Sequence, residues 1–154
     1  MPNRFRRLFA TLAALTLLMT LAATPALATR PVFVFQTLMV GENEVPGPGD
    51  GDAVGHATVL IVPDTDLVCW VLSWNRIDGV TVAAHIHGPA TTSQAVAPIV
   101  PFFQGVAHSG TDTNRGCTTS AAWADAIVAD PAMFYVNVHS VPLFGPGAIR
   151  GQLG

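Results

Sequence analysis

Three of the five histidines lie on two predicted β-strands, at a spacing that could bind a metal ion. His85 and His87 are two residues apart at the end of an alternating apolar segment, and Gly88 and Pro89 end that segment. Side chains two residues apart on a strand point to the same face, so both imidazoles are expected on one side of the sheet. His139 ends a second apolar segment. If the two strands are neighbours, the three imidazoles converge.

Three neutral imidazoles form a donor set that suits copper or zinc, with an open fourth position for water or substrate. We therefore take His85, His87 and His139 as candidate metal ligands, with copper expected before zinc. The alternative is that each histidine only forms a hydrogen bond to a nearby loop. His56 and His108 lie outside this set, and both are expected at the surface.

Glu44 is the carboxylate to consider beside these histidines. It sits in a polar loop just before Pro46, where it could orient a histidine or bind the ion directly. The alternative, which we favour, is an ion pair with Arg150 on the last predicted strand. Asn137 and Gln152 are expected to tie strands to loops rather than to take part in chemistry.

Strand alternation also predicts which faces form the core. On the late strand one face is purely apolar and the opposite face carries Asn137 and His139; the apolar set is Phe134, Val136 and Val138. On the earlier strand the inward set is Val82, Ala84 and Ile86. The histidines are therefore expected on faces that point away from the core.

Short apolar segments separated by turn residues predict an all-β domain. The expected strands cover residues 32–40, 55–62, 67–74, 80–87, 95–103, 133–139 and 148–153, with residues 116–119 briefly extended. Pro98 and Pro101 indicate that the fifth segment is an edge strand or irregular backbone, and residues 104–114 are expected to form a polar loop. One short helix, capped by Ser120, is expected near 120–129. The pattern predicts a Greek-key β-sandwich or barrel.

The N-terminus has the pattern of a signal peptide. Three arginines precede a mostly apolar run over residues 8–22, and Ala26-Leu27-Ala28 has the small-x-small form that signal peptidase cleaves. We expect a signal peptide at residues 1–28 and a single domain at 29–154, in a secreted or periplasmic protein. The alternative, an uncleaved anchor helix, is disfavoured by the short apolar run and by Pro25.

Composition limits the classes of partner. Without residues 1–28 the chain has four arginines, no lysine and all ten carboxylates, which gives a formal net charge of −6. This charge argues against nucleic acid or an anionic membrane surface as partner. After cleavage no stable membrane insertion is expected. No nucleophile–base motif and no phosphate-binding glycine loop is present in the sequence, so hydrolase or transferase chemistry has no support.

Two cysteines remain, Cys69 and Cys117. In an exported chain an even pair predicts one disulfide. The alternative is a thiolate metal site or a redox pair, although no CxxC motif is present.

Four segments together resemble the CHRD domain family, which is named for chordin and also occurs in exported bacterial proteins. The matching segments are residues 41–46, 84–90, 135–140 and 147–153, in family order. Ser140 is a departure, since the family often has Thr there. The resemblance implies an immunoglobulin-like β-barrel or sandwich and a poorly defined biochemical role. It carries the family's histidine positions to His85, His87 and His139, and its acidic loop position to Glu44.

A fainter similarity is to copper-zinc superoxide dismutase, which also has an HxH strand in a Greek-key barrel. Residues 84–87 match its copper strand in form, and residues 147–150 loosely resemble a late segment. The bridging histidine and the zinc-loop aspartate pattern are not recognisable, so the similarity leaves dismutase activity in doubt and a mononuclear copper site open.

These observations predict an exported, non-catalytic CHRD binding module for an undefined extracellular ligand or protein. A separate hypothesis is a purely structural cell-surface or matrix module. The alternative is a copper-binding, redox-capable secreted or periplasmic protein that uses the three histidines.

Overall fold

The computed structural model of the protein describes residues 29–154. The segment 1–28, where the sequence predicts a signal peptide, lies outside the described residues. Among residues 29–154, no helix combines the length and the apolar character needed to cross a bilayer.

Eight strands and one short α-helix make up the described part of the chain. The strands are β1 (Phe33–Val40), β2 (Val54–Val62), β3 (Leu67–Asn75), β4 (Val80–His87), β5 (Pro98–His108), β6 (Asp112–Thr119), β7 (Tyr135–Val141) and β8 (Ile149–Gln152). The helix is α1 (Ala124–Ala129), and single 3-10 turns are η1 (Gly41–Asn43), η2 (Pro63–Thr65) and η3 (Pro131–Met133). The all-β prediction with one short helix is confirmed.

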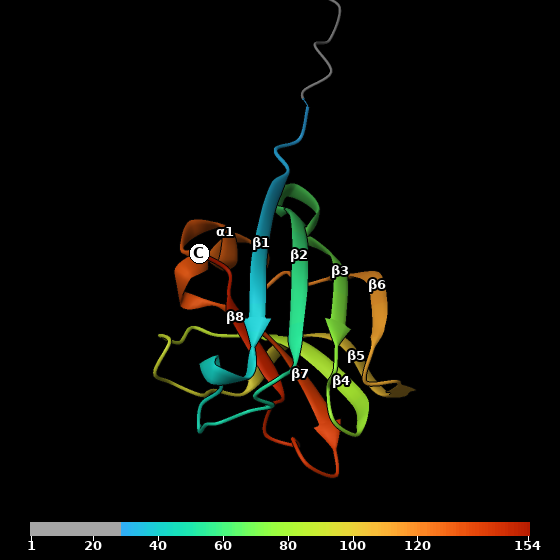
Figure 1. The fold of residues 1–154 in the computed structure, drawn as a ribbon. Coiled ribbons are helices and arrows are strands. Elements are labelled where there is room, and N and C mark those ends of the chain that lie inside the picture. The colour runs from blue at the N-terminus through green and yellow to red at the C-terminus, as the bar shows by residue number, and fades with distance from the viewer. Residues whose placement is uncertain (1–28) are drawn as a thin grey trace, which may run out of the picture.

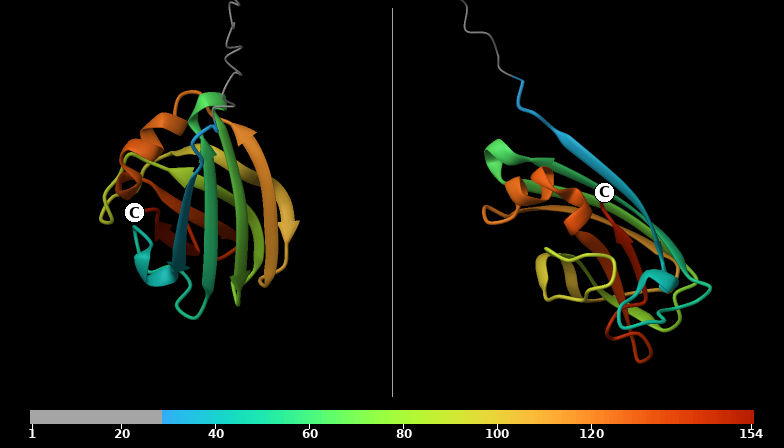
Figure 2. Two further views of the ribbon diagram at one scale, coloured as in Figure 1. Left: turned by 90° about the horizontal axis from the view of Figure 1, so that it is seen from above. Right: turned by 90° about the vertical axis from the view of Figure 1, so that its left-hand side faces the viewer.

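All eight strands belong to one antiparallel sheet, in the order β5-β4-β7-β8-β1-β2-β3-β6. The sheet curls on itself so that β1, β2, β3 and β6 lie in front of β4, β5 and β7 (Figure 1). Seen from above, the strands wrap around a common interior in a nearly closed barrel (Figure 2). The order makes β4 and β7 direct neighbours although 47 residues separate the ends His87 and Tyr135 in numbering.

The interior of this curled sheet is the hydrophobic core. Alternate residues of the facing strands fill it: Val59, Ile61, Val68 and Leu72 from β2 and β3, and Ala84, Ile86, Val136 and Val138 from β4 and β7. Val82, which the alternation also predicts inward, is not part of the core, because the register of β4 shifts between Thr81 and Ala83. Phe134 also belongs to this core. Fixing these faces inward fixes the opposite faces of β4 and β7 outward, which positions the histidines.

Helix α1 is shorter than predicted. It begins at Ala124, and the predicted side-chain cap by Ser120 does not form. The backbone oxygen of Ser120 instead accepts hydrogen bonds from the amides of Trp123 and Ala124, in the turn that precedes the helix. Ala124 and Ile127 are fully buried, so the helix covers part of the core.

The region around residues 104–114 differs most from expectation. The predicted polar loop is wrong, because β5 continues to His108 and β6 begins at Asp112. The edge position predicted from Pro98 and Pro101 is correct, since β5 ends the sheet and pairs with β4. An edge strand tolerates residues that cannot complete a ladder on both sides.

Cys69 and Cys117 lie opposite each other on β3 and β6 and form a disulfide, as predicted. Their Cα atoms are 4.0 Å apart and the bond spans 48 residues of sequence. It fastens β6, the strand at the other end of the sheet, to its neighbour. The thiolate alternative is therefore wrong, because both cysteines are oxidised.

Candidate functional site

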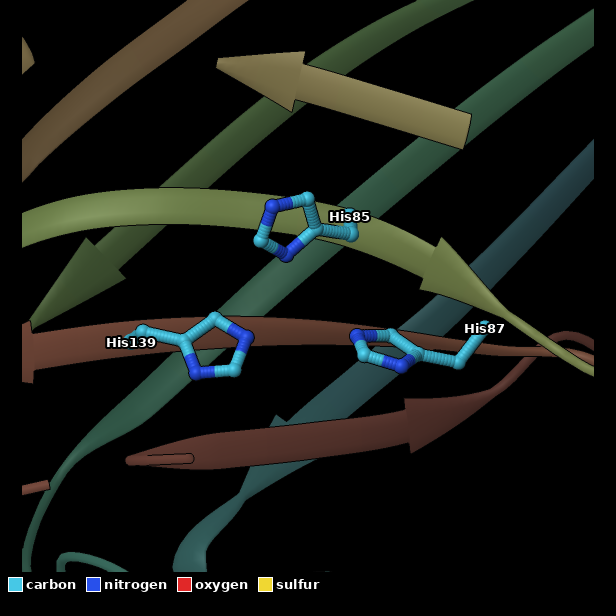
Figure 3. Close-up of side chains that lie close together, drawn as sticks. All are labelled: His85, His87 and His139. Atoms are coloured by element: carbon cyan, nitrogen blue, oxygen red, sulfur yellow. The ribbon is translucent and has the colours of Figure 1, made fainter. Parts of the chain in front are cut away.

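The three histidines of the candidate set meet on the outer face of β4 and β7. Because the two strands are antiparallel neighbours, His139 lies opposite Ala83, two residues before His85 on the same face. The three side chains each offer one ligand atom, and these atoms all lie within 4.8 Å of one another. Figure 3 shows the three rings facing a common space, each with one nitrogen turned toward it.

Backbone carbonyl groups hold two of the rings from behind. The Nδ1 of His87 lies 2.8 Å from the oxygen of Val96, and the Nδ1 of His139 lies 2.9 Å from the oxygen of Gly145. A carbonyl oxygen only accepts, so each Nδ1 carries the hydrogen and each neutral ring keeps its lone pair on Nε2. Both rings are thereby fixed in the tautomer that can bind a cation through Nε2.

One further nitrogen of each ring is buried and has no partner among the described residues. They are the Nδ1 of His85 and the Nε2 atoms of His87 and His139. Buried polar atoms are nearly always satisfied, and an unsatisfied one costs about 1–3 kcal/mol. One ligand placed between the rings would satisfy all three atoms at once.

All three imidazoles are neutral at physiological pH. Burial, together with smaller effects of nearby His139 and His87, lowers the pKa of His85 to about 4. Burial likewise lowers the pKa of His87 to about 4, with its bond to Val96 acting in the opposite direction. The pKa of His139 is also lowered by burial. Neutral rings do not have to lose a proton before they bind a metal.

This outer face is buried because loops cover it. Sequence alternation correctly places the histidines away from the core, yet His85 and His87 are each only 6% exposed. The covering segments lie between β1 and β2, between β4 and β5, and between β7 and β8, and they include Glu44, Val96 and Gly145. The site is therefore a second, polar interior beneath three loops.

Glu44 reaches into this polar layer and meets Asn137. The Nδ2 of Asn137 donates to the Oε1 of Glu44 over 2.6 Å, and both residues are buried. Burial raises the pKa of Glu44 to about 8, although the charge of Arg150 opposes the rise. Among the described residues, the Oδ1 of Asn137 has no hydrogen-bond partner.

The favoured ion pair between Glu44 and Arg150 is wrong. The only contact within ion-pair distance among residues 29–154 joins the side chains of His108 and Asp112. The guanidinium of Arg150 instead donates to loop carbonyl groups, at 2.8 Å to Gln94 and 2.9 Å to Thr91. Arg150 lies beyond ion-pair distance of Glu44 and influences its pKa only through space.

Arg150 and Gln152 together anchor the loop between β4 and β5. Gln152 donates to the carbonyl oxygen atoms of Ala90 and Ala132, as expected of a residue that ties strands to loops. Arg150 binds the same loop two residues before Gln152 on β8. Because this loop also provides the Val96 oxygen that holds His87, β8 helps to position a candidate ligand.

The other two histidines do not join this cluster. His56 is exposed on β2, as predicted. His108 is not a surface residue: its side chain is 15% exposed, pairs with Asp112 and packs against Phe103 and Trp74. His108 is shielded because β5 extends as far as this residue and places it on the sheet.

Sequence reasoning missed Tyr135 and the carbonyl groups behind the rings. Alternation could have identified Tyr135, since it shares its face with Asn137 and His139. No sequence signal identifies Val96 or Gly145, because any residue offers a backbone oxygen.

Comparison with curated proteins gives no match, and comparison with solved structures gives none either. The family model of the CHRD domain matches residues 35–153, which include all eight strands except the first two residues of β1, all three clustered histidines and Glu44. The match covers well over half of the chain, and the protein therefore belongs to the CHRD domain family.

Proposed function

We propose that this chain is an exported binding module whose ligand is a transition-metal ion, copper in the first place and zinc in the second. The observation that carries the proposal is the set of three buried, unpartnered imidazole nitrogens on His85, His87 and His139, whose ligand atoms lie within 4.8 Å of one another. Membership of the CHRD family supports a binding module.

The dimensions of the cluster suit one ion. Metal–nitrogen bonds of about 2 Å put the ligand nitrogens of one ion within roughly 4 Å of each other. The observed limit of 4.8 Å exceeds this separation by less than about 1 Å. Ligating histidines usually donate their second nitrogen to a carbonyl or carboxylate, as His87 and His139 do here.

The donor type favours copper and zinc over hard cations. Imidazole suits these two metals, whereas magnesium and calcium prefer oxygen. A function in ion binding rather than turnover agrees with the absence of a nucleophile–base motif from the sequence. Export is supported by the signal-peptide pattern and by the disulfide, which is typical of oxidising compartments.

Metal analysis and titration of the purified exported chain test the proposal. We expect one copper or zinc ion per chain, lost in His87→Ala and retained in His56→Ala, which removes an exposed histidine outside the cluster. Circular dichroism would check that both variants are folded. Weak binding that His87→Ala leaves unchanged, or equal losses in the two variants, would overturn the proposal.

A dismutase assay of the copper-loaded protein distinguishes an ion carrier from a redox-active copper centre. An ion carrier would show no more activity than free copper in the same buffer. Activity above that level, lost in His87→Ala, would establish a redox-active copper centre instead.

A further inference from the structure

We propose that Asn137 is the fourth ligand of the ion, through its Oδ1, and that it closes the site against water. The inference rests on the proposed function, because it adds a ligand to the three histidines. It assigns a role in binding to a residue whose expected role is only to tie a strand to a loop.

Asn137 occupies the position on the sheet that neighbours all three histidines. It lies directly opposite His85 on β4, and two residues from His139 on the same face of β7. His87 pairs with Tyr135, so Asn137 is its diagonal neighbour. Directly opposed Cβ atoms are about 4.5–5.5 Å apart and diagonal ones about 7–8 Å, within reach of these side chains.

The side-chain oxygen of Asn137, like one nitrogen of each histidine ring, is buried without a hydrogen-bond partner. Six buried side-chain atoms lack a partner among the described residues, and four of them belong to this face: the Oδ1 of Asn137 and one nitrogen from each clustered histidine. Asn137 is 2% exposed, so bulk water does not satisfy its oxygen. An ion bound by the histidines would satisfy all four atoms together.

Glu44 orients the amide for this role. It accepts from Nδ2, so Oδ1 is directed away from Glu44. The loop that carries Glu44 approaches from the β8 side, where the amide of Asp50 donates to the oxygen of Ala148. The strand β4, with His85, lies on the other side of β7. The geometry therefore directs Nδ2 toward the loop and Oδ1 toward the histidines.

A fourth protein ligand changes what the site does. Zinc sites with four protein ligands hold the ion, whereas catalytic sites keep one position for water or substrate. A neutral set of three nitrogens and one oxygen has no soft sulfur, so it favours divalent copper or zinc over monovalent copper. The site is thus a closed holder of a divalent ion.

The test compares the copper(II) form of the full exported chain with Asn137→Ala. A copper-bound water shortens the relaxation time of bulk water protons, so relaxation reports the open position. We expect little relaxation enhancement in the wild type and a clear increase in Asn137→Ala. The affinity should fall on the order of 10- to 100-fold while the stoichiometry stays at one ion per chain.

Two further variants make the result specific. Gln36→Leu removes an exposed amide on β1, whose side chain contacts Thr58 and no residue of the site, and should change neither readout. The double variant Asn137→Asp with Glu44→Gln reverses the hydrogen bond without a change of shape and retains an oxygen donor. It should keep water out, and it stands in for Asn137→Ala if that variant does not fold.

The outcomes separate this inference from the proposed function. Wild-type protein that binds no ion would overturn both. Wild-type protein that binds one ion through the histidines but already shows strong water relaxation, or an affinity unchanged in Asn137→Ala, would overturn the role of Asn137 alone.

Discussion

The ring of Tyr135 stacks on the ring of His87, with centroids 4.8 Å apart and an angle of 6° between the planes. The guanidinium carbon of Arg150 lies 3.4 Å from the centroid of the Tyr135 ring. Two groups at these distances cannot share one face of the ring, so Tyr135 is held between Arg150 and His87. The stack fixes the plane of a candidate ligand from one side, while the Val96 oxygen fixes its direction of rotation.

Substitution of Tyr135 should weaken ion binding more when it removes the aromatic ring than when it keeps the ring. Tyr135→Leu removes the aromatic face, and we expect the affinity for copper or zinc to fall about tenfold, as for other groups that orient ligands. Tyr135→Phe keeps the stack and loses only the hydroxyl that accepts from the Val96 amide, so it should have a smaller effect. Competitive titration with a chelator measures both. Equal effects of the two variants would contradict a role for the stack.

The stability of the metal-free protein should decrease as the pH falls from about 6.5 to about 4. In the folded state, the pKa values of His85 and His87 are about 4, against 6.5 for an ordinary histidine. In this window the unfolded chain binds protons that the folded chain does not, so acidification favours unfolding. Urea unfolding at pH 7 and pH 5, with a chelator present, measures the difference.

The double variant His85→Leu with His87→Leu is the control for this acid effect. It lacks the two buried imidazoles, so it should lose less stability than the wild type over the same interval. Because Glu44 titrates in both proteins, the comparison between them isolates the histidines: an equal change in stability between pH 7 and pH 5 in the wild type and in this variant would show that the histidines are not buried in the neutral form.

Glu44 should act in the opposite direction at higher pH. Burial raises its pKa from 4.5 to about 8 in the folded state, so the folded chain retains a proton that the unfolded chain has lost. Stability from this group is fully present below about pH 4.5 and is lost as the pH rises from there to about 8, so it opposes the histidine effect between pH 5 and pH 7. Above pH 7 the histidines no longer change the stability. The free energy of unfolding should then decline, because of Glu44 alone, by at most about 1.4 kcal/mol per pH unit.

Glu44→Gln isolates this alkaline effect. An amide at position 44 can still accept from Asn137 but does not titrate, so the stability of the variant should be flat between pH 7 and pH 8. Urea midpoints of both proteins at these two values provide the comparison. A wild-type curve that is already flat would contradict the raised pKa.

The outward placement of the histidines could be predicted because alternation is a local property of a strand. Their burial could not, since it depends on loops that belong to distant parts of the chain. The extension of β5 and β6 was hidden because residues 104–114 are rich in Gly, Asn, Asp and Ser, which are typical of turns. Strand β6 contains few residues that favour strands, and the disulfide between Cys117 and Cys69 holds it against β3.

The expected ion pair of Glu44 shows a second limit of sequence reasoning. Opposite charges in adjoining segments favour a pair, but Arg150 has a better set of partners in the carbonyl groups of Thr91 and Gln94. A planar guanidinium suits several fixed acceptors at once. Backbone acceptors carry no signature in the sequence, so their competition for Arg150 could be seen only in the structure.

Gly147→Ala should disrupt the polar layer beneath the loops. Gly147 has a φ of 157°, and a Cβ there would lie 2.5 Å from the Nδ2 of Asn137 and would also collide with the Oε2 of Glu44. The methyl group must therefore separate the two side chains or move the loop, at a cost of about 1–3 kcal/mol. Gly145→Ala is a matched control in the same loop, since its Cβ would meet nothing within 4 Å and its oxygen stays available to His139. Thermal unfolding and copper titration should both show a loss for Gly147→Ala and none for Gly145→Ala. Equal behaviour of the two variants would mean that the contact between Glu44 and Asn137 contributes neither to stability nor to ion binding.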